Sequence, residues 1–176
     1  MVELSEAIGE ESARLVMAKK YPEFDEIPSQ LPGKGKQGQF DLVYYNKDTG
    51  EIITVEAKGG ASTRGSRKTV DGLQAEQGSP EYRDSVTANM EKKIEDAQKD
   101  PRYDTNSDKY DPDFKTQVDD LEDTLDKINI AKKGKKGKKL IKSVQVAQRL
   151  NTDGSLKPQA ELSKFRNTYS KMDHKK

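Results

Sequence analysis

Apolar and polar positions over residues 38–60 follow the pattern of a β-hairpin. Residues 40–45 and 51–58 are rich in β-branched and aromatic side chains, and a polar NKDTG segment separates them. Two such runs around a Gly-containing turn predict a pair of antiparallel strands. Because side chains alternate along a strand, Glu56 and Lys58 share one face of the second strand.

The register of this hairpin brings charged groups together. With residues 47–50 as a four-residue loop, Asp41 lies directly opposite Glu56, and Lys58 follows on the same face. Two carboxylates and an amine then converge within an apolar sheet, which costs free energy unless a metal or a substrate uses them. The hairpin is therefore the first candidate for a functional site.

Helical periodicity occurs on both sides of the hairpin. Residues 3–20 predict a helix whose apolar stripe contains Leu4, Ile8, Ala13, Leu15, Val16 and Met17. Gly9 in this helix allows close approach to another backbone. Residues 80–131 predict a helical pair, in which Ser79 and Asp111 are N-caps and each is followed by proline.

The remaining segments predict loops and further strands. Residues 21–37 contain three prolines and a Gly-Lys run, and residues 59–78 contain five glycines; both predict connecting loops. Residues 132–139 form a basic low-complexity loop. Residues 140–148 alternate and predict a strand, while residues 157–165 either pair back as another strand or stay irregular.

Composition narrows the chemistry. The chain has 176 residues, no cysteine and one histidine, His174, which lies in a lysine-rich tail. This length suits one domain. Disulfides, thiolate sites and histidine triads are excluded, so carboxylates must perform any metal or acid–base work. There is no apolar run long enough to cross a membrane and no secretory signal pattern at the N-terminus.

Charge is distributed unevenly along the chain. Residues 1–126 hold 17 basic and 28 acidic residues, whereas residues 127–176 hold 15 basic and 3 acidic ones. A basic C-terminal third predicts a polyanionic partner. Pairing of the two halves within one molecule is the alternative explanation.

Asp41 and the Glu56-x-Lys58 pair, placed on adjacent strands after a helix, resemble the PD-(D/E)XK nuclease superfamily. Gly9-Glu10-x-x-Ala13 is similar to the helical Gly-Glu-x-x-Ala of that group, with Glu6 as a second candidate for its glutamate. The resemblance implies an α/β fold, restriction-endonuclease-like, with a central mixed sheet flanked by helices. It makes residues 1–176 one nuclease domain, with a core over about 3–100, an acidic helical segment at 101–131, and a basic loop and C-terminal strands at 132–170.

The same resemblance implies a metal-dependent phosphodiesterase. Asp41, Glu56 and the carbonyl of Ala57 would hold a divalent cation, Mg²⁺ or Mn²⁺ rather than Zn²⁺, because hard cations prefer oxygen ligands. Lys58 would orient or help deprotonate the attacking water, or stabilise charge on the transition state. Glu10 would complete the catalytic group. The proline of the superfamily name is absent, because Gln39-Phe40 precedes Asp41.

A narrower resemblance links the chain to the nuclease domains at the C-termini of bacterial polymorphic toxins, of the contact-dependent inhibition and type VI effector kinds. The shared motifs, within about residues 5–95, are K-x-G-x-F-D-x-V-Y, V-E-A-K-G-G, G-S-R and Q-G-S-P-E-Y. This implies a monomeric domain secreted or delivered as part of a larger toxin, active in the target-cell cytoplasm, and neutralised by a cognate immunity protein. It also implies that Gln77-Gly78 closes over the active site and that Arg67 lies in a substrate-side loop.

Two polymers remain as possible substrates. The basic tail and the loop basic residues predict affinity for a phosphate backbone, and the candidate contacts are Lys34, Lys36, Arg64, Arg67 and Lys68. No aromatic platform for unpaired bases is evident, which favours DNA. An RNase toxin that cleaves transfer RNA is the alternative. A restriction- or repair-type endonuclease without an immunity partner, and a non-catalytic nucleic-acid-binding module, are the other classes.

Overall fold

The computed structural model describes residues 2–31, 38–60, 66–68, 74–136 and 138–167, and only the backbone of 2–5 and 66–68. Its helices are α1 (Val2–Lys20), α2 (Pro80–Gln98) and α3 (Pro112–Lys133). Its strands are β1 (Asp25–Ile27), β2 (Leu42–Tyr45), β3 (Ile52–Gly59), β4 (Ser66–Lys68), β5 (Gln74–Glu76), β6 (Ile141–Gln148) and β7 (Glu161–Lys164).

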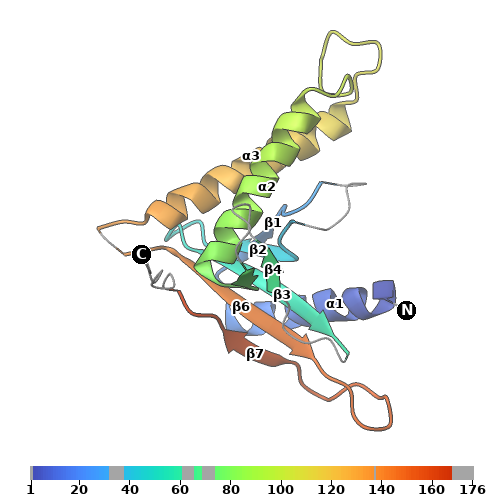
Figure 1. Ribbon diagram of the computed structural model, residues 1–176, viewed down its shortest axis with the longest axis vertical. Helices are drawn as coiled ribbons and strands as arrows, with labels where there is room; N and C mark the ends of the chain where they lie inside the picture. The colour runs from blue at the N-terminus through green and yellow to red at the C-terminus, as the bar shows by residue number, and fades with distance from the viewer. Residues whose placement is uncertain (1, 32–37, 61–65, 69–73, 137, 168–176) are drawn as a thin grey trace, which may run out of the picture.

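A five-stranded mixed sheet forms the centre of the protein (Figure 1). Its strand order is β1-β2-β3-β6-β7, and β3 and β6 are the parallel pair at its middle. All the other neighbours in this sheet run antiparallel. With helices on both faces, this confirms the predicted α/β fold with a central mixed sheet flanked by helices.

The α1 helix covers one face of the sheet at unusually short range. An added Cβ at Gly9 would lie 2.8 Å from the backbone nitrogen of Gly59, so the helix passes directly over the end of β3. Ala13 and Met17, one and two turns further on, are fully buried against β2, β3 and β6. Gly9 and Ala13 are small, and this lets the helix and the strand approach closely.

The α2 and α3 helices lie side by side and extend away from the other face of the sheet (Figure 1). Their apolar stripes are buried against each other and against Val43, Ile52 and Ile141. Both predicted caps are confirmed: the Ser79 hydroxyl accepts a hydrogen bond from the Tyr82 N–H, and the Asp111 carboxylate accepts two from the first turn of α3. Along the described residues, no helix is long and apolar enough to cross a bilayer.

Three local predictions were wrong. The loop predicted at residues 21–37 contains β1, a short edge strand, and the loop predicted at 59–78 contains the two-stranded β4–β5 sheet. Leu15, assigned to the apolar stripe of the first helix, is 66% exposed. The contact made by Gly9 fixes the rotation of α1, and Leu15 therefore lies away from the sheet. Of the two alternatives for residues 157–165, the return strand forms, over Glu161–Lys164 as β7.

Candidate active site

The hairpin of β2 and β3 has the predicted register. Leu42 pairs with Val55 and Tyr45 pairs with Ile52, and the turn closes with a hydrogen bond from the Gly50 N–H to the Asn46 carbonyl (2.8 Å). One step beyond the last paired residues, Asp41 faces Glu56. The four-residue loop is therefore confirmed, and the register continues to Asp41 opposite Glu56, with Asp41 directly preceding the first residue of β2.

Asp41 is held by the backbone of β3 beside Glu56. The N–H of Ala57 donates a hydrogen bond to Asp41 Oδ2 (2.8 Å). In an extended strand the N–H and C=O groups of one residue point to the same side, so the Ala57 carbonyl also points toward the β2 side of β3. The Asp41 carboxylate thus contacts the backbone of Ala57 through its N–H group, and Glu56 is the preceding residue in the chain.

Glu56 is one of the most buried charged residues of the sheet. It is 2% exposed, and the amide of Gln77 donates a hydrogen bond to its Oε2 atom. On the parallel strand, the buried Gln145 is its register partner. A buried carboxylate needs such polar neighbours, since its desolvation is otherwise strongly unfavourable. Lys58 is half-buried two residues further on, beside the backbone contact of Gly9.

Glu10 reaches the site from α1. It lines a surface hollow of about 430 Å³ together with Asp41, Arg14 and Glu26. Arg14 lies 3.9 Å from Glu10 and forms a 3.0 Å ion pair with Glu26. The hydrogen bond to Glu26 raises the pKa of Arg14, despite some burial. The structure therefore brings Glu10 together with Asp41, while Glu56 does not line this hollow among the described residues.

A buried polar group on β3 and β6 was not anticipated from the sequence. Thr54 and Ser143 share a hydrogen bond of 2.6 Å, and the Arg83 guanidinium donates to the Ser143 hydroxyl (3.1 Å). Arg83 is 2% exposed although it belongs to α2. Because Thr54 shares a face with Glu56, this group extends the polar area along the sheet. The only sequence signal was an arginine adjacent to the apolar stripe of α2, which is also typical of a solvated position.

The oxygen donors suit a hard divalent cation. Asp41 and Glu56 supply two carboxylates, and the backbone of Ala57 lies beside the first of them. Mg²⁺ is commonly bound through one or two carboxylates and keeps several waters. Among the described residues, no three His, Cys, Asp or Glu side chains form a group that could hold an ion. Two carboxylate donors suit Mg²⁺ or Mn²⁺ better than Zn²⁺, whose protein sites usually include His or Cys ligands.

The predicted nucleic-acid contacts lie mostly outside the described side chains. Lys34, Lys36 and Arg64 are outside the described residues. The backbone of Arg67 and Lys68 belongs to β4, which pairs with β5 just before Gln77. The Arg67 segment thus forms a small antiparallel sheet within the connection between Lys58 and Gln77.

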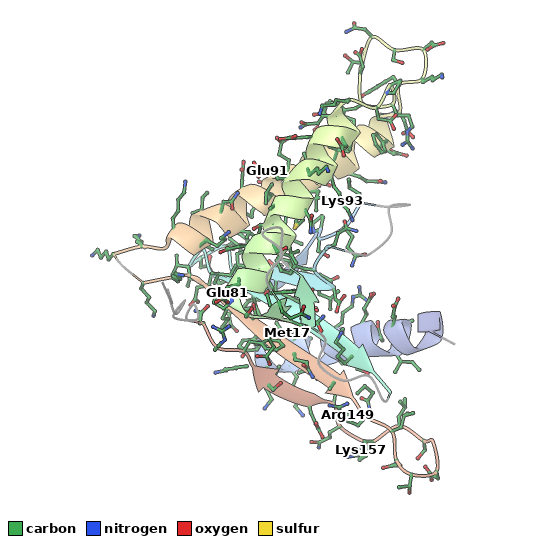
Figure 2. All side chains as sticks on the ribbon, viewed as in Figure 1. Met17, Glu81, Glu91, Lys93, Arg149 and Lys157 are labelled. Carbon is green, nitrogen blue, oxygen red and sulfur yellow. The ribbon has the colours of Figure 1, made fainter. Side chains whose placement is uncertain are left out.

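Two further basic residues lie near the end of β3 that carries Lys58. Arg149 and Lys157 stand on the loop after β6 (Figure 2). The end of β6 is tied to the end of β3 through the hydrogen bond from the Gly60 N–H to the Gln148 carbonyl (2.9 Å). Arg149 is 3.8 Å from Glu161. Basic side chains therefore accompany the end of β3 that carries Lys58.

No protein-family model matches the chain, and comparison with curated proteins and with solved structures gave no significant match either. Geometry and chemistry are therefore the basis for a functional assignment.

Proposed function

We propose that this protein is a metal-dependent endonuclease that hydrolyses phosphodiester bonds of DNA. The observation that supports this best is the hydrogen bond from the Ala57 N–H to Asp41. It holds one carboxylate at the strand position next to the buried Glu56, in the register that a Glu-x-Lys strand requires.

Each residue of this group has a role in the proposed reaction. Asp41, Glu56 and the Ala57 carbonyl would bind Mg²⁺. When bound, the ion would neutralise the phosphate and lower the pKa of a coordinated water. Lys58, on the same face as Glu56, would orient that water or stabilise the negative charge that develops on the phosphate oxygens.

Two neighbours would complete the site. Gln77 keeps the Glu56 carboxylate in one orientation through its side-chain amide. Glu10 shares the hollow of Asp41, where it would bind a metal-coordinated water or a second cation. A ligand that is held by a hydrogen bond from its surroundings loses less entropy on metal binding, which explains why such neighbours raise metal affinity.

DNA is the favoured substrate because the sequence is rich in basic residues near its C-terminus but has no tryptophan and no evident aromatic platform for unpaired bases. The C-terminal residues 127–176 are strongly basic, and Arg149 and Lys157 lie near the end of β3 that bears Lys58. Such contacts bind phosphate backbones without reading bases. Stacking on aromatic rings, which single-stranded RNA recognition usually needs, has no evident counterpart.

The resemblance to polymorphic-toxin nuclease domains supports a role in competition between bacteria. In that role the domain acts as a monomer in the target-cell cytoplasm after delivery as part of a larger toxin, and a cognate immunity protein neutralises it. A restriction- or repair-type endonuclease would have the same chemistry but no such partner, so co-purification with the product of the adjacent gene distinguishes the two roles.

The proposal can be tested by incubating the purified protein with supercoiled plasmid, and separately with total transfer RNA, in the presence of Mg²⁺. We expect nicking and linearisation of the plasmid, and no cleavage after addition of a chelator. Glu56→Gln should reduce cleavage to the level of the blank, because it removes a metal ligand. Lys58→Ala should reduce the rate by about 10²- to 10³-fold, as for loss of one charge-stabilising group.

Matched controls come from the same hairpin. Glu51→Gln and Lys47→Ala change the same residue types at its turn, away from the proposed site, and should retain full activity. Cleavage of transfer RNA with an intact plasmid would replace DNA by RNA as the substrate. Full activity of both Glu56→Gln and Lys58→Ala would contradict the proposed site.

A further inference from the structure

The chain after β7 returns to the part of the molecule that covers Glu56. Figure 1 shows it passing from β7 to the N-terminal end of α2. The N–H of Phe165 donates to the Ser143 carbonyl (3.0 Å), and the Asn167 amide donates to the Ile141 carbonyl (2.9 Å). Residues 165–167, which we call the C-terminal strap, therefore continue along β6 beyond the end of β7.

Phe165 packs directly against the turn that bears Gln77. Gly78 has φ of +81°, and a Cβ at this position would overlap the ring of Phe165. Glycine is needed here for two reasons, since a larger residue would be strained in this conformation and would displace the ring. The aromatic ring thus rests on the backbone next to Gln77.

Polar contacts attach the strap to the first turns of α2. Arg166 Nη2 lies 3.2 Å from Glu81 Oε2, and Glu81 stands at the start of the helix (Figure 2). Arg83 Nη2 donates to Asn167 Oδ1 (2.8 Å), while its Nη1 atom donates to the Ser143 hydroxyl. Arg83 therefore links the strap to β6.

We propose that the C-terminal strap positions Gln77 on Glu56, with Phe165 as the positioning residue. The contacts form a continuous series: the Phe165 ring holds Gly78, the adjacent Gln77 donates to Glu56, and Glu56 adjoins the Ala57 contact with Asp41. The catalytic consequence rests on the proposed nuclease function. The structural consequence, that Phe165 determines the position of the Gln77 side chain, does not.

A double-mutant cycle tests the catalytic consequence. We expect Phe165→Ala and Gln77→Ala each to lower plasmid cleavage by about 10- to 100-fold at limiting Mg²⁺, as is typical of residues that orient a metal ligand. The double variant should be no slower than the slower single variant, because both changes remove one interaction. Phe165→Tyr keeps the aromatic ring and should cleave at the wild-type rate. Multiplication of the two single effects would overturn the proposal.

The amide signals of Gln77 provide a readout that does not depend on activity. In a ¹H–¹⁵N spectrum, the pair of side-chain amide signals that disappears in Gln77→Ala belongs to Gln77. In the wild type this pair should lie away from the position of a water-exposed glutamine. Phe165→Ala should move it to that position, whereas Leu162→Ala, which shortens a β7 side chain that packs on the α1 face, should not. An unchanged Gln77 signal in Phe165→Ala would overturn the proposed role of the C-terminal strap. Absence of cleavage by the wild type would overturn only the nuclease function.

Discussion

The two faces of the central strands are both buried, but they bury different chemistry. On the face toward α1, every second residue of β3 and β6 contributes to an apolar cluster that includes Ile53, Val55, Val144 and Val146. On the other face, apolar Ile52 and Ile141 are followed by a buried polar group, which comprises Thr54, Glu56, Ser143 and Gln145 together with Arg83 of α2. One face stabilises the fold through apolar burial. The other face buries polar groups in fixed positions, which lowers stability and is a pattern typical of functional sites.

The strongest test of this comparison is Ile53→Ala, on the apolar face. Ile53 is fully buried between α1 and the sheet, and its truncation removes apolar contact and leaves a cavity. We expect a loss of about 2–5 kcal/mol in the free energy of unfolding, measured by urea denaturation. Cleavage per folded molecule should stay the same, because no polar contact of the site changes.

Two other variants serve as controls for this variant. Thr54→Val, one residue further on the polar face, should cost about 0.5–1.5 kcal/mol through loss of a hydrogen bond and should also lower cleavage. Ile130→Ala, at a side chain that is 66% exposed, should leave stability unchanged. A cost below about 1 kcal/mol for Ile53→Ala would show that α1 does not pack as described.

Gly9→Ala tests the short distance between α1 and β3. In an unconstrained helix this change stabilises by about 1 kcal/mol. Here the new methyl group would lie 2.8 Å from the Gly59 nitrogen, and we expect a net destabilisation of about 1–3 kcal/mol together with slower cleavage, since Lys58 must shift. Thermal unfolding and plasmid assays measure the two effects. Stabilisation would contradict the contact, and Leu15→Ala on the exposed side of the same helix should be near neutral.

The smallest effect concerns the buried hydroxyl of Tyr44, in the apolar cluster on the α1 face. Burial, followed by the nearby Glu26 carboxylate, raises the pKa of Tyr44 to about 12, compared with about 10 in an unfolded chain. The folded state keeps a proton that the unfolded state releases, so stability is present below pH ~10 and is lost as the pH rises toward ~12.

Urea denaturation at several alkaline pH values checks this dependence. Tyr44→Phe should flatten the fall in stability between about pH 10 and 12, with a change of only about 1 kcal/mol near pH 8. Tyr110→Phe, at an exposed position, is the control and should leave the curve unaltered. An identical alkaline fall in wild type and Tyr44→Phe would assign the dependence to other groups.

Local patterns were sufficient to predict the hairpin and its register. Its turn and its two strands are contiguous, so the position of Asp41 opposite Glu56 follows from loop length and alternation alone. The caps at Ser79 and Asp111 are equally local. The β1 strand was missed because three mostly exposed residues, Asp25–Ile27, carry no apolar alternation.

Contacts between distant segments could not be predicted in the same way. The alternation of Thr54, Val55 and Glu56 is usually typical of a strand with one wet face, and only the position of α2 shows that the polar face is buried. Arg83 likewise becomes a core residue through Ser143, which is 60 residues away. The contact of Gln77 with Glu56 joins positions 21 residues apart, and nothing in the sequence indicated that Phe165 packs on the turn beside it.

The parallel pairing of β3 with β6 has a consequence for folding kinetics. Thr54 and Ser143 are 89 positions apart, so this pairing closes a long loop before it gains any contact energy, and such long-range closure slows folding. The hairpin and the two capped helices can form early from local interactions. Glu56 acquires its neighbours on β6 only in the late step. We therefore expect partly folded chains to contain most of the secondary structure and no assembled site.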